Sequence, residues 1–176
     1  GMNVLRLGFE YIASLDVASA MMEGPAGRSL IQETFDEALS FRRALANLRQ
    51  NLAADDWWFS IWQPDQAGGE GVHTGDWLLQ PNADWHGFGE IAEDYVLLDP
   101  IKVTLVMPGL SADGRLTEAG IPAAVVSKFL WERGLVVEKT GLYSFLVLFS
   151  MGITKGKWST LLTELLEFKR LYDANV

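Results

Sequence analysis

Two apolar runs on either side of one short turn constrain the fold of this chain more than any other feature. Residues 136–138 and 143–149 have the β-branched and aromatic composition of strands, and Thr140-Gly141 lies between them. Strands joined by so short a turn can pair back on each other as an antiparallel hairpin. The sequence therefore predicts a hairpin in which Glu138 lies close to the turn, at the edge of a sheet.

Two more strands and one long loop are predicted upstream of this hairpin. Residues 57–62 are mostly aromatic, and residues 101–107 form an apolar run between Pro100 and Pro108. Residues 64–95 are rich in Gly, Pro, Asp and Asn. This composition predicts a long loop, and its length makes it a candidate for a functional or interface role.

The first half of the chain is predicted to contain two helices. The first spans residues 11–22 and ends at Gly24-Pro25, where a glycine and a following proline act as stop signals. The second begins with a capping box formed by Ser29 and Gln32. Its buried stripe follows helical spacing, with one polar member: Phe35, Ala38, Leu39, Arg42, Leu45, Leu48 and Leu52.

Two further helices are predicted in the second half. One has Pro122 in its first turn and ends at Gly134, and the other spans residues 154–173. The buried stripe of the last helix is predicted to be Trp158, Leu161, Leu162, Leu165, Phe168 and Tyr172.

The order of these elements predicts the fold class. Hairpin-like strand pairs mixed with helices indicate an α+β fold, with a mostly antiparallel sheet of about four strands and packed helices. No strand is followed by a Gly-rich turn into a helix, so a parallel nucleotide-binding sheet is disfavoured.

Composition excludes several classes of function. The 176 residues suit one domain of ordinary size, and a net charge of −9 disfavours nucleic acid and anionic membranes as partners. No apolar run has membrane-spanning length. The absence of cysteine excludes disulfides and thiolate metal sites and fits a cytoplasmic protein. Seven tryptophans predict a large aromatic contribution to a core or an interface.

Few residues could carry chemistry by themselves. The two histidines, His73 and His86, lie in the long loop, where His86 could pair with Asp84 or Asp99 in a catalytic arrangement or could simply pack locally. The acidic clusters lack histidines at metal-binding spacing, so no metal site is expected. Glu138 could pair with a substrate ammonium from a rigid sheet edge, or it could form a surface pair with a neighbouring lysine.

Blocks of sequence along nearly the whole chain resemble one enzyme family. The blocks lie at residues 13–18, 21–24, 85–88, 98–105, 108–109, 120–123, 132–134, 136–141, 149–153 and 168–170. Together, and in this order, they are similar to the large bacterial ornithine/lysine/arginine decarboxylases.

The resemblance implies a fold-type-I enzyme dependent on pyridoxal phosphate (PLP), which removes the α-carboxylate of a basic amino acid to give a diamine or polyamine. Residues 1–28 resemble the last helix of the PLP domain, and residues 29–176 resemble the α+β subdomain that follows it. In the Val-Val-Glu-Lys-Thr block, Glu138 matches the residue that meets the distal amino group of the substrate.

The chain departs from the family in one essential respect. The Schiff-base lysine of the family lies in a Ser-x-His-Lys segment upstream of the region covered here, and none of the six lysines follows a histidine. We therefore expect no catalytic residue and no bound cofactor in this segment, and no activity from it alone.

Three functions remain open from the residues alone. The chain is a partial decarboxylase, a stand-alone binding or interaction module derived from the subdomain, or an unrelated small enzyme built around His86. A basic amino acid is the expected substrate only of the full-length enzyme. Removing the family's other domains exposes apolar surface, so we also expect a homodimer or larger assembly, with the tryptophans and the first helix contributing.

Overall fold

The structure, a computed structural model, describes residues 2–68, 73–92, 95–111, 114–117 and 119–175, with the side chains of 2–7, 68 and 74 left undescribed. Four α-helices and one sheet make up the fold: α1 (Met2–Glu23), α2 (Pro25–Gln50), α3 (Ala123–Glu132) and α4 (Lys155–Asp173). Two short 3₁₀ helices, η1 (Asp65–Gly68) and η2 (Thr74–Trp77), lie in the long loop. None of the helices described is both long and apolar enough to cross a membrane.

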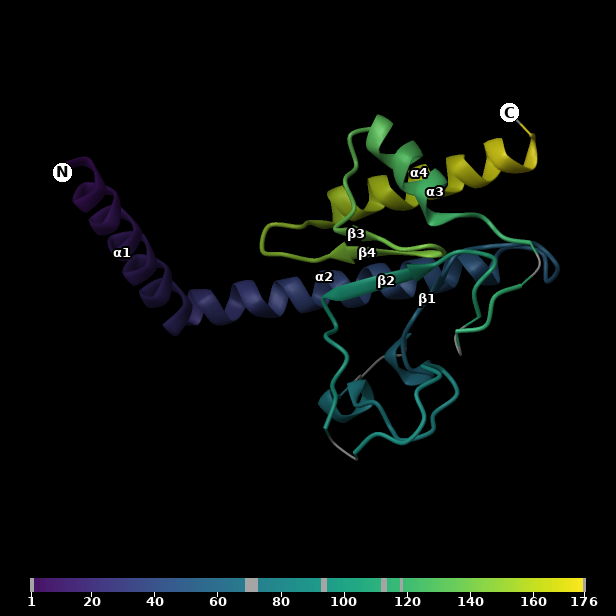
Figure 1. Cartoon of the computed structure of the whole chain (residues 1–176), viewed down its shortest axis with the longest axis horizontal. Helices are drawn as coiled ribbons and strands as arrows, with labels where there is room; N and C mark the ends of the chain where they lie inside the picture. Colours follow the sequence, from purple (N-terminus) through teal and green to yellow (C-terminus); the bar gives the residue numbers. More distant parts are fainter. Residues whose placement is uncertain (1, 69–72, 93–94, 112–113, 118, 176) are drawn as a thin grey trace.

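The sheet has four strands in the order β1-β2-β4-β3, and every neighbouring pair is antiparallel. The strands are β1 (Ser60–Ile61), β2 (Lys102–Val106), β3 (Lys139–Thr140) and β4 (Ser144–Leu148). The predicted α+β class and four-stranded antiparallel sheet are therefore confirmed. Figure 1 shows α2 and α4 running along the sheet, with α3 beside α4 and α1 projecting away from the rest.

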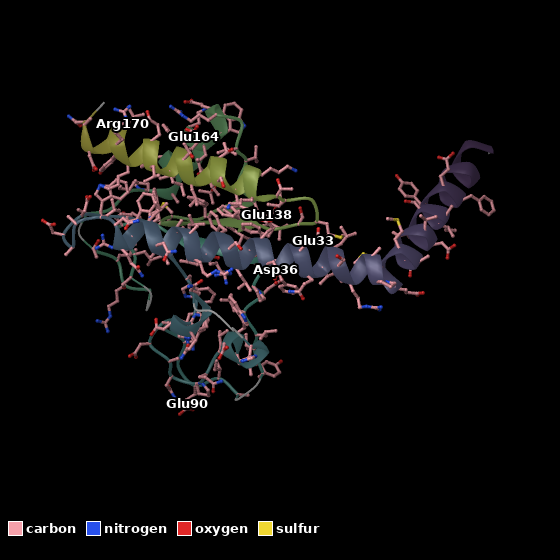
Figure 2. The ribbon with its side chains drawn as sticks, turned by 180° about the vertical axis from the view of Figure 1, so that it is seen from behind. Glu33, Asp36, Glu90, Glu138, Glu164 and Arg170 are labelled. Carbon is pink, nitrogen blue, oxygen red and sulfur yellow. The ribbon has the colours of Figure 1, made fainter. Side chains whose placement is uncertain are left out.

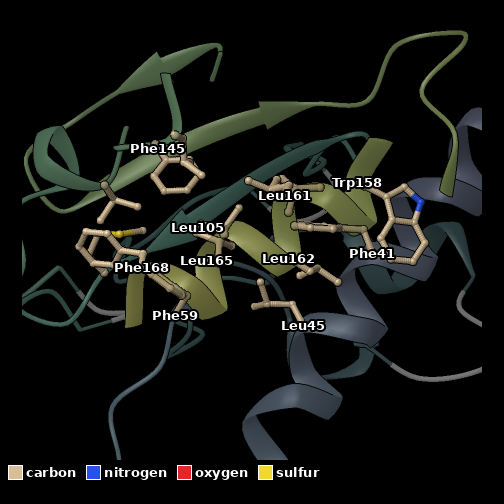
Figure 3. Close-up of a cluster of buried hydrophobic side chains, with 14 of the residues drawn as sticks. Phe41, Leu45, Phe59, Leu105, Phe145, Trp158, Leu161, Leu162, Leu165 and Phe168 are labelled. Carbon is tan, nitrogen blue, oxygen red and sulfur yellow. The ribbon is translucent and has the colours of Figure 1, made fainter. Parts of the chain in front are cut away.

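One core lies between the sheet, α2 and α4. Phe41 of α2 contacts Phe149, which follows β4, with ring centroids 5.4 Å apart, and contacts Trp158 of α4 at 6.1 Å. Figure 3 shows apolar side chains from both helices and from β2 and β4 meeting in this cluster: Phe41, Leu45, Phe59, Leu105, Phe145, Trp158, Leu161, Leu162, Leu165 and Phe168. The predicted stripe of α4 is buried, except that Tyr172 is half exposed.

The predicted start of the second helix is wrong. The helix begins at Pro25, with Gly24 as its N-cap, and Ser29 and Gln32 lie inside it. Ser29 Oγ donates to Glu33 and Gln32 Nε2 to Asp36, so neither side chain caps the backbone. Proline at the first helical position has no N–H to leave unpaired, which explains the earlier start.

Two predicted strands are shorter than expected. In the aromatic run 57–62, Ser60 and Ile61 pair with β2 and the Trp62 N–H donates to the Thr104 carbonyl, whereas Trp57 and Phe59 pack their rings against Phe168 of α4. The run 136–138 lies before β3, which begins at Lys139, and Pro122 caps α3 from outside its first turn. The predicted strands 101–107 and 143–149 correspond to β2 and β4.

Arg42, the one polar residue in the predicted stripe of α2, is buried. The Arg42 guanidinium donates to the carbonyl oxygens of Pro100 and Lys102 and to Gln63 Oε1, at 2.8–3.2 Å. The Arg42 Cζ lies over the Trp77 ring, 5.0 Å from its centroid. Burial lowers the pKa of Arg42 to about 10, against the opposing charge of Asp99. Arg42 therefore ties both ends of the long loop to α2.

Candidate functional site

Glu138 stands at the entry to β3 on a fixed backbone. Helix α3 ends at Glu132, and Gly134, with φ of +79°, reverses the chain toward the sheet. The Glu138 backbone N–H then donates to the Leu146 carbonyl of β4 at 2.9 Å. The side chain is exposed, and Figure 2 shows it near the middle of the molecule on the side seen from behind. The peptide is thus held by the sheet while the carboxylate stays accessible.

Glu138 lines an open cavity of about 490 Å³. The walls come from the segment before β3, the end of β4 and the first turns of α4. The floor is apolar and includes Val147, Phe149 and Leu161, whereas Ser150, Lys157 and Thr160 are polar. A carboxylate at the rim of an apolar cavity suits a ligand that carries an ammonium group on an aliphatic chain.

The Glu138 carboxylate makes no hydrogen bond or ion pair with the residues that the structure describes. Lys157, which also lines the cavity, donates its Nζ to the Gly152 carbonyl at 2.8 Å. Lys157 was missed by sequence reasoning. Its place at the cavity depends on which face of α4's first turn meets the end of β4, and no local pattern encodes that.

Three of the lysines are engaged by carboxylates, which does not favour the attachment of PLP to them. Lys169 is buried, but its Nζ lies 2.6 Å from both Asp56 and Asp173. Burial lowers the pKa of Lys169, yet the hydrogen bonds to Asp173 and Asp56 outweigh burial and raise it. A Schiff-base lysine needs the opposite, an amine that loses its proton readily. Lys102 and Lys128 form surface ion pairs, at 3.3 Å each.

His86 is a packing residue, as one of the two interpretations predicted. Its Nδ1 accepts the Phe88 backbone N–H at 3.0 Å, so Nε2 carries the proton and donates to the Gln80 carbonyl at 2.9 Å. Trp85 and Phe88 flank the ring. Both ring nitrogens are occupied, and neither meets Asp84 or Asp99, so a catalytic arrangement around His86 is not assembled.

His73 lies apart from this cluster, at the N-cap of η2, where its backbone N–H donates to Asp76 at 2.6 Å. No group of three or more potential metal ligands occurs within the described parts of the chain. Glu138 combines an exposed carboxylate with the cavity of about 490 Å³, whereas the exposed His73 and Asp84 line cavities of about 310 and 330 Å³.

Comparison with known proteins gives consistent matches over this region. The sequence model of the family described as "Orn/Lys/Arg decarboxylase, major domain" matches residues 8–157. Lysine decarboxylase LdcA of Pseudomonas aeruginosa is 82% identical over 166 residues, covering 94% of this chain and 22% of that protein. A lysine decarboxylase of Hafnia alvei is 48% identical, with 94% and 22% covered.

A solved structure shows the same likeness in three dimensions. Lysine decarboxylase A from Pseudomonas aeruginosa superposes with a TM-score of 0.86 at 82% identity, covering 94% of this chain and 22% of that one. The chain thus spans about a fifth of the length of the relatives it matches.

Proposed function

Because this chain belongs to the Orn/Lys/Arg decarboxylase family, we propose that it supplies the substrate-selecting part of a decarboxylase acting on a basic amino acid. Glu138 pairs with the distal ammonium of the substrate. The lysine that binds PLP, and with it the chemical step, belongs to parts of the enzyme outside this segment. Residues 1–28 belong with the preceding PLP domain, and residues 29–176 form the following subdomain. The full enzyme acts in the cytoplasm and yields a diamine or polyamine.

The exposed, unpartnered Glu138 carboxylate at the cavity rim carries this proposal. A hydrogen bond to a charged group contributes about 1.5–3 kcal/mol, or roughly ten- to a hundredfold in affinity. That gain depends on a carboxylate that is already positioned and has no competing cation. The hydrogen bond from the Glu138 peptide to Leu146 supports the first condition, and the lack of an ion pair at Glu138 among the described residues supports the second.

Lysine is the first substrate to test. The relatives at 82% and 48% identity are named lysine decarboxylases. A stand-alone binding module remains the second candidate, favoured by the exposed apolar side chains of α1. The two candidates differ in one measurable way: a stand-alone module binds its ligand as the isolated chain, whereas a substrate-selecting segment needs the rest of the enzyme.

The test is a chimera in which this chain replaces the matching segment of Pseudomonas aeruginosa LdcA. Glu138→Gln keeps the shape of the side chain and removes its charge. We expect the KM for lysine to rise about tenfold or more with kcat changed far less, because uniform substrate binding is lost. Bound PLP, read from its absorbance, should be unchanged.

Glu167→Gln is the matched control, because Glu167 pairs with Arg170 on α4 and does not line the cavity. It should leave the KM for lysine as it is. An unchanged KM in Glu138→Gln contradicts the proposed role. Lysine binding by the isolated chain, abolished by Glu138→Gln, favours the stand-alone module instead.

A further inference from the structure

Helices α1 and α2 meet backbone to backbone at Gly27. Only Gly24 separates the two helices, and Gly27 is buried in the first turn of α2. A Cβ added at Gly27 would lie 2.5 Å from the Cα and the carbonyl oxygen of Met22, and 2.7 Å from the carbonyl oxygen of Met21. All three atoms are backbone, so no side chain can move aside. We call this junction of α1 and α2 the elbow; Figure 1 shows the two helices meeting there at an angle. That angle depends on Gly27, because any residue with a Cβ would clash with the end of α1.

The elbow joins two parts of different kinds. Helix α2 packs into the core through residues such as Phe41 and Leu45. Helix α1 presents apolar side chains that are more than half exposed: Phe9, Tyr11, Ile12, Leu15, Val17 and Met21. A helix that is apolar on several sides is typically buried within a larger protein. Under the proposed function, α1 packs into the part of the enzyme that lies beyond this segment.

We propose that Gly27 is a positioning residue for the Glu138 site. The contact between Gly27 and Met22 fixes the angle between α1, held by the rest of the enzyme, and the subdomain that carries Glu138. This inference rests on the proposed function.

A small rotation at the elbow produces a large displacement at residues far from it. At 1.5 Å per residue the first half of α2 spans about 20 Å, and a rotation of about 10° at the elbow moves a point that far away by about 3–4 Å. A hydrogen bond does not survive a displacement of that size. A single added methyl group at the elbow can therefore separate the Glu138 carboxylate from a substrate held by the rest of the enzyme.

The test compares Gly27→Ala with Gly24→Ala in the same LdcA chimera. A Cβ added at Gly24 would meet nothing within 4 Å, and the φ of −85° at Gly24 suits alanine. Gly24→Ala therefore adds the same methyl group to the same elbow without a steric clash. We expect Gly27→Ala to raise the KM for lysine about tenfold, with a smaller change in kcat and unchanged PLP absorbance. Gly24→Ala should leave both constants unchanged.

The angle at the elbow can be measured directly in this chain, as a distance between a label on α1 and a label on α4. The sequence has no cysteine, so spin labels can be placed cleanly at Tyr11→Cys on α1 and Thr163→Cys on α4, both exposed positions. Gly27→Ala should shift the distance between the labels by several ångströms, and Gly24→Ala should not. An unchanged distance overturns the proposal, as does a changed distance with an unchanged KM. Where the Gly27→Ala chimera is insoluble, an unchanged distance in this chain still overturns the proposal.

The two proposals fail separately. An unchanged KM in Glu138→Gln removes the substrate role of Glu138, whereas the distance shift in Gly27→Ala does not depend on Glu138 at all. A raised KM in Glu138→Gln together with an unchanged KM in Gly27→Ala removes only the role of the elbow.

Discussion

At the scale of single residues, two buried cations hold the chain together in different ways. Among the described residues, Arg42 has no carboxylate within hydrogen-bonding distance and is satisfied by two backbone carbonyls and Gln63. Lys169 is paired with two carboxylates and stacks at 4.7 Å over Trp57. The Lys169 cluster links the end of α4 to the segment before β1, because Asp56 comes from that segment and Asp173 from α4.

This cluster predicts a specific dependence of stability on pH. The hydrogen bonds from Lys169 and then from Trp57 lower the pKa of the Asp173 carboxyl below its ordinary value of 3.8. Asp173 therefore stabilises the fold above pH 3.8, and this contribution is lost as the pH falls through the lower pKa of the folded state. Lys169, whose pKa is raised, contributes below pH 10.5 and loses that contribution as the pH rises through its folded pKa.

We expect Asp173→Asn to lower the free energy of unfolding at neutral pH and to have a shrinking effect as the pH falls below 3.8. Urea unfolding across the acid range measures this difference. Asp84→Asn, at an exposed position in the long loop, is the control and should follow the wild type. A deficit for Asp173→Asn that stays constant down to the lowest pH would contradict the role of the charge.

At the scale of elements, close backbone packing fixes the hairpin that carries Glu138. A Cβ at Gly120 would lie 2.5 Å from Gly109 Cα and from the Pro108 carbonyl oxygen, and 2.8 Å from the Tyr143 ring. Tyr143 directly precedes β4, and its carbonyl accepts the Met107 N–H at 2.8 Å. The loop of the hairpin is thus anchored against the segment that follows β2.

Gly120→Ala should therefore destabilise the chain by about 1–3 kcal/mol, the range for overpacking a tight site. Gly75→Ala is the control, since nothing lies within 4 Å of a Cβ there. Thermal unfolding of the two variants checks the difference. Equal melting temperatures would show that the Gly109–Gly120 contact can relax without cost.

The elements that sequence predicted well are those in which local pattern and tertiary packing agree. In α4, the helical spacing of Trp158, Leu161 and Leu165 coincides with the face that meets the core. Where the two disagree, tertiary packing decides. Trp57 and Phe59 have strand propensity but lie before β1, with their rings packed against Phe168 of α4.

The candidate site was predictable only in part. The hairpin pattern placed Glu138 at a sheet edge, and the family resemblance gave it a role. The cavity beside it depends on how the first turns of α4 approach the end of β4, so it required the structure. The role of Gly27 at the elbow could not be predicted, because the sequence does not show how closely two consecutive helices approach.

At the scale of the whole molecule, α1 carries more exposed large apolar side chains than any other element that the structure describes. Of the seven tryptophans, only Trp131 is exposed, at 59%, so the tryptophans serve mainly the core and the loop. The expected contribution to self-association therefore falls to α1, whose exposed residues include Ile12 and Leu15. Figure 1 shows this helix projecting from the rest of the fold.

We expect the isolated chain to form a homodimer or larger assembly that dissociates on dilution, because burying α1 against another copy removes this surface from water. Light scattering over a wide concentration range measures the mass. Ile12→Lys combined with Leu15→Lys should shift the chain toward the monomer, while Lys substitution of the exposed Thr163 on α4 should not. A monomeric mass at every concentration would rule out the expectation.

The pairing of α2 with α4 also has a consequence for how the chain is made. The ring of Phe41 packs against Trp158, and Glu37 accepts a hydrogen bond from the Trp158 indole. More than a hundred residues separate these partners in the sequence. At about 5–20 residues per second, the apolar stripe of α2 leaves the ribosome roughly 6–25 seconds before α4 arrives to cover it. During translation this stripe stays uncovered until α4 has been synthesised, and the core of this segment closes only then.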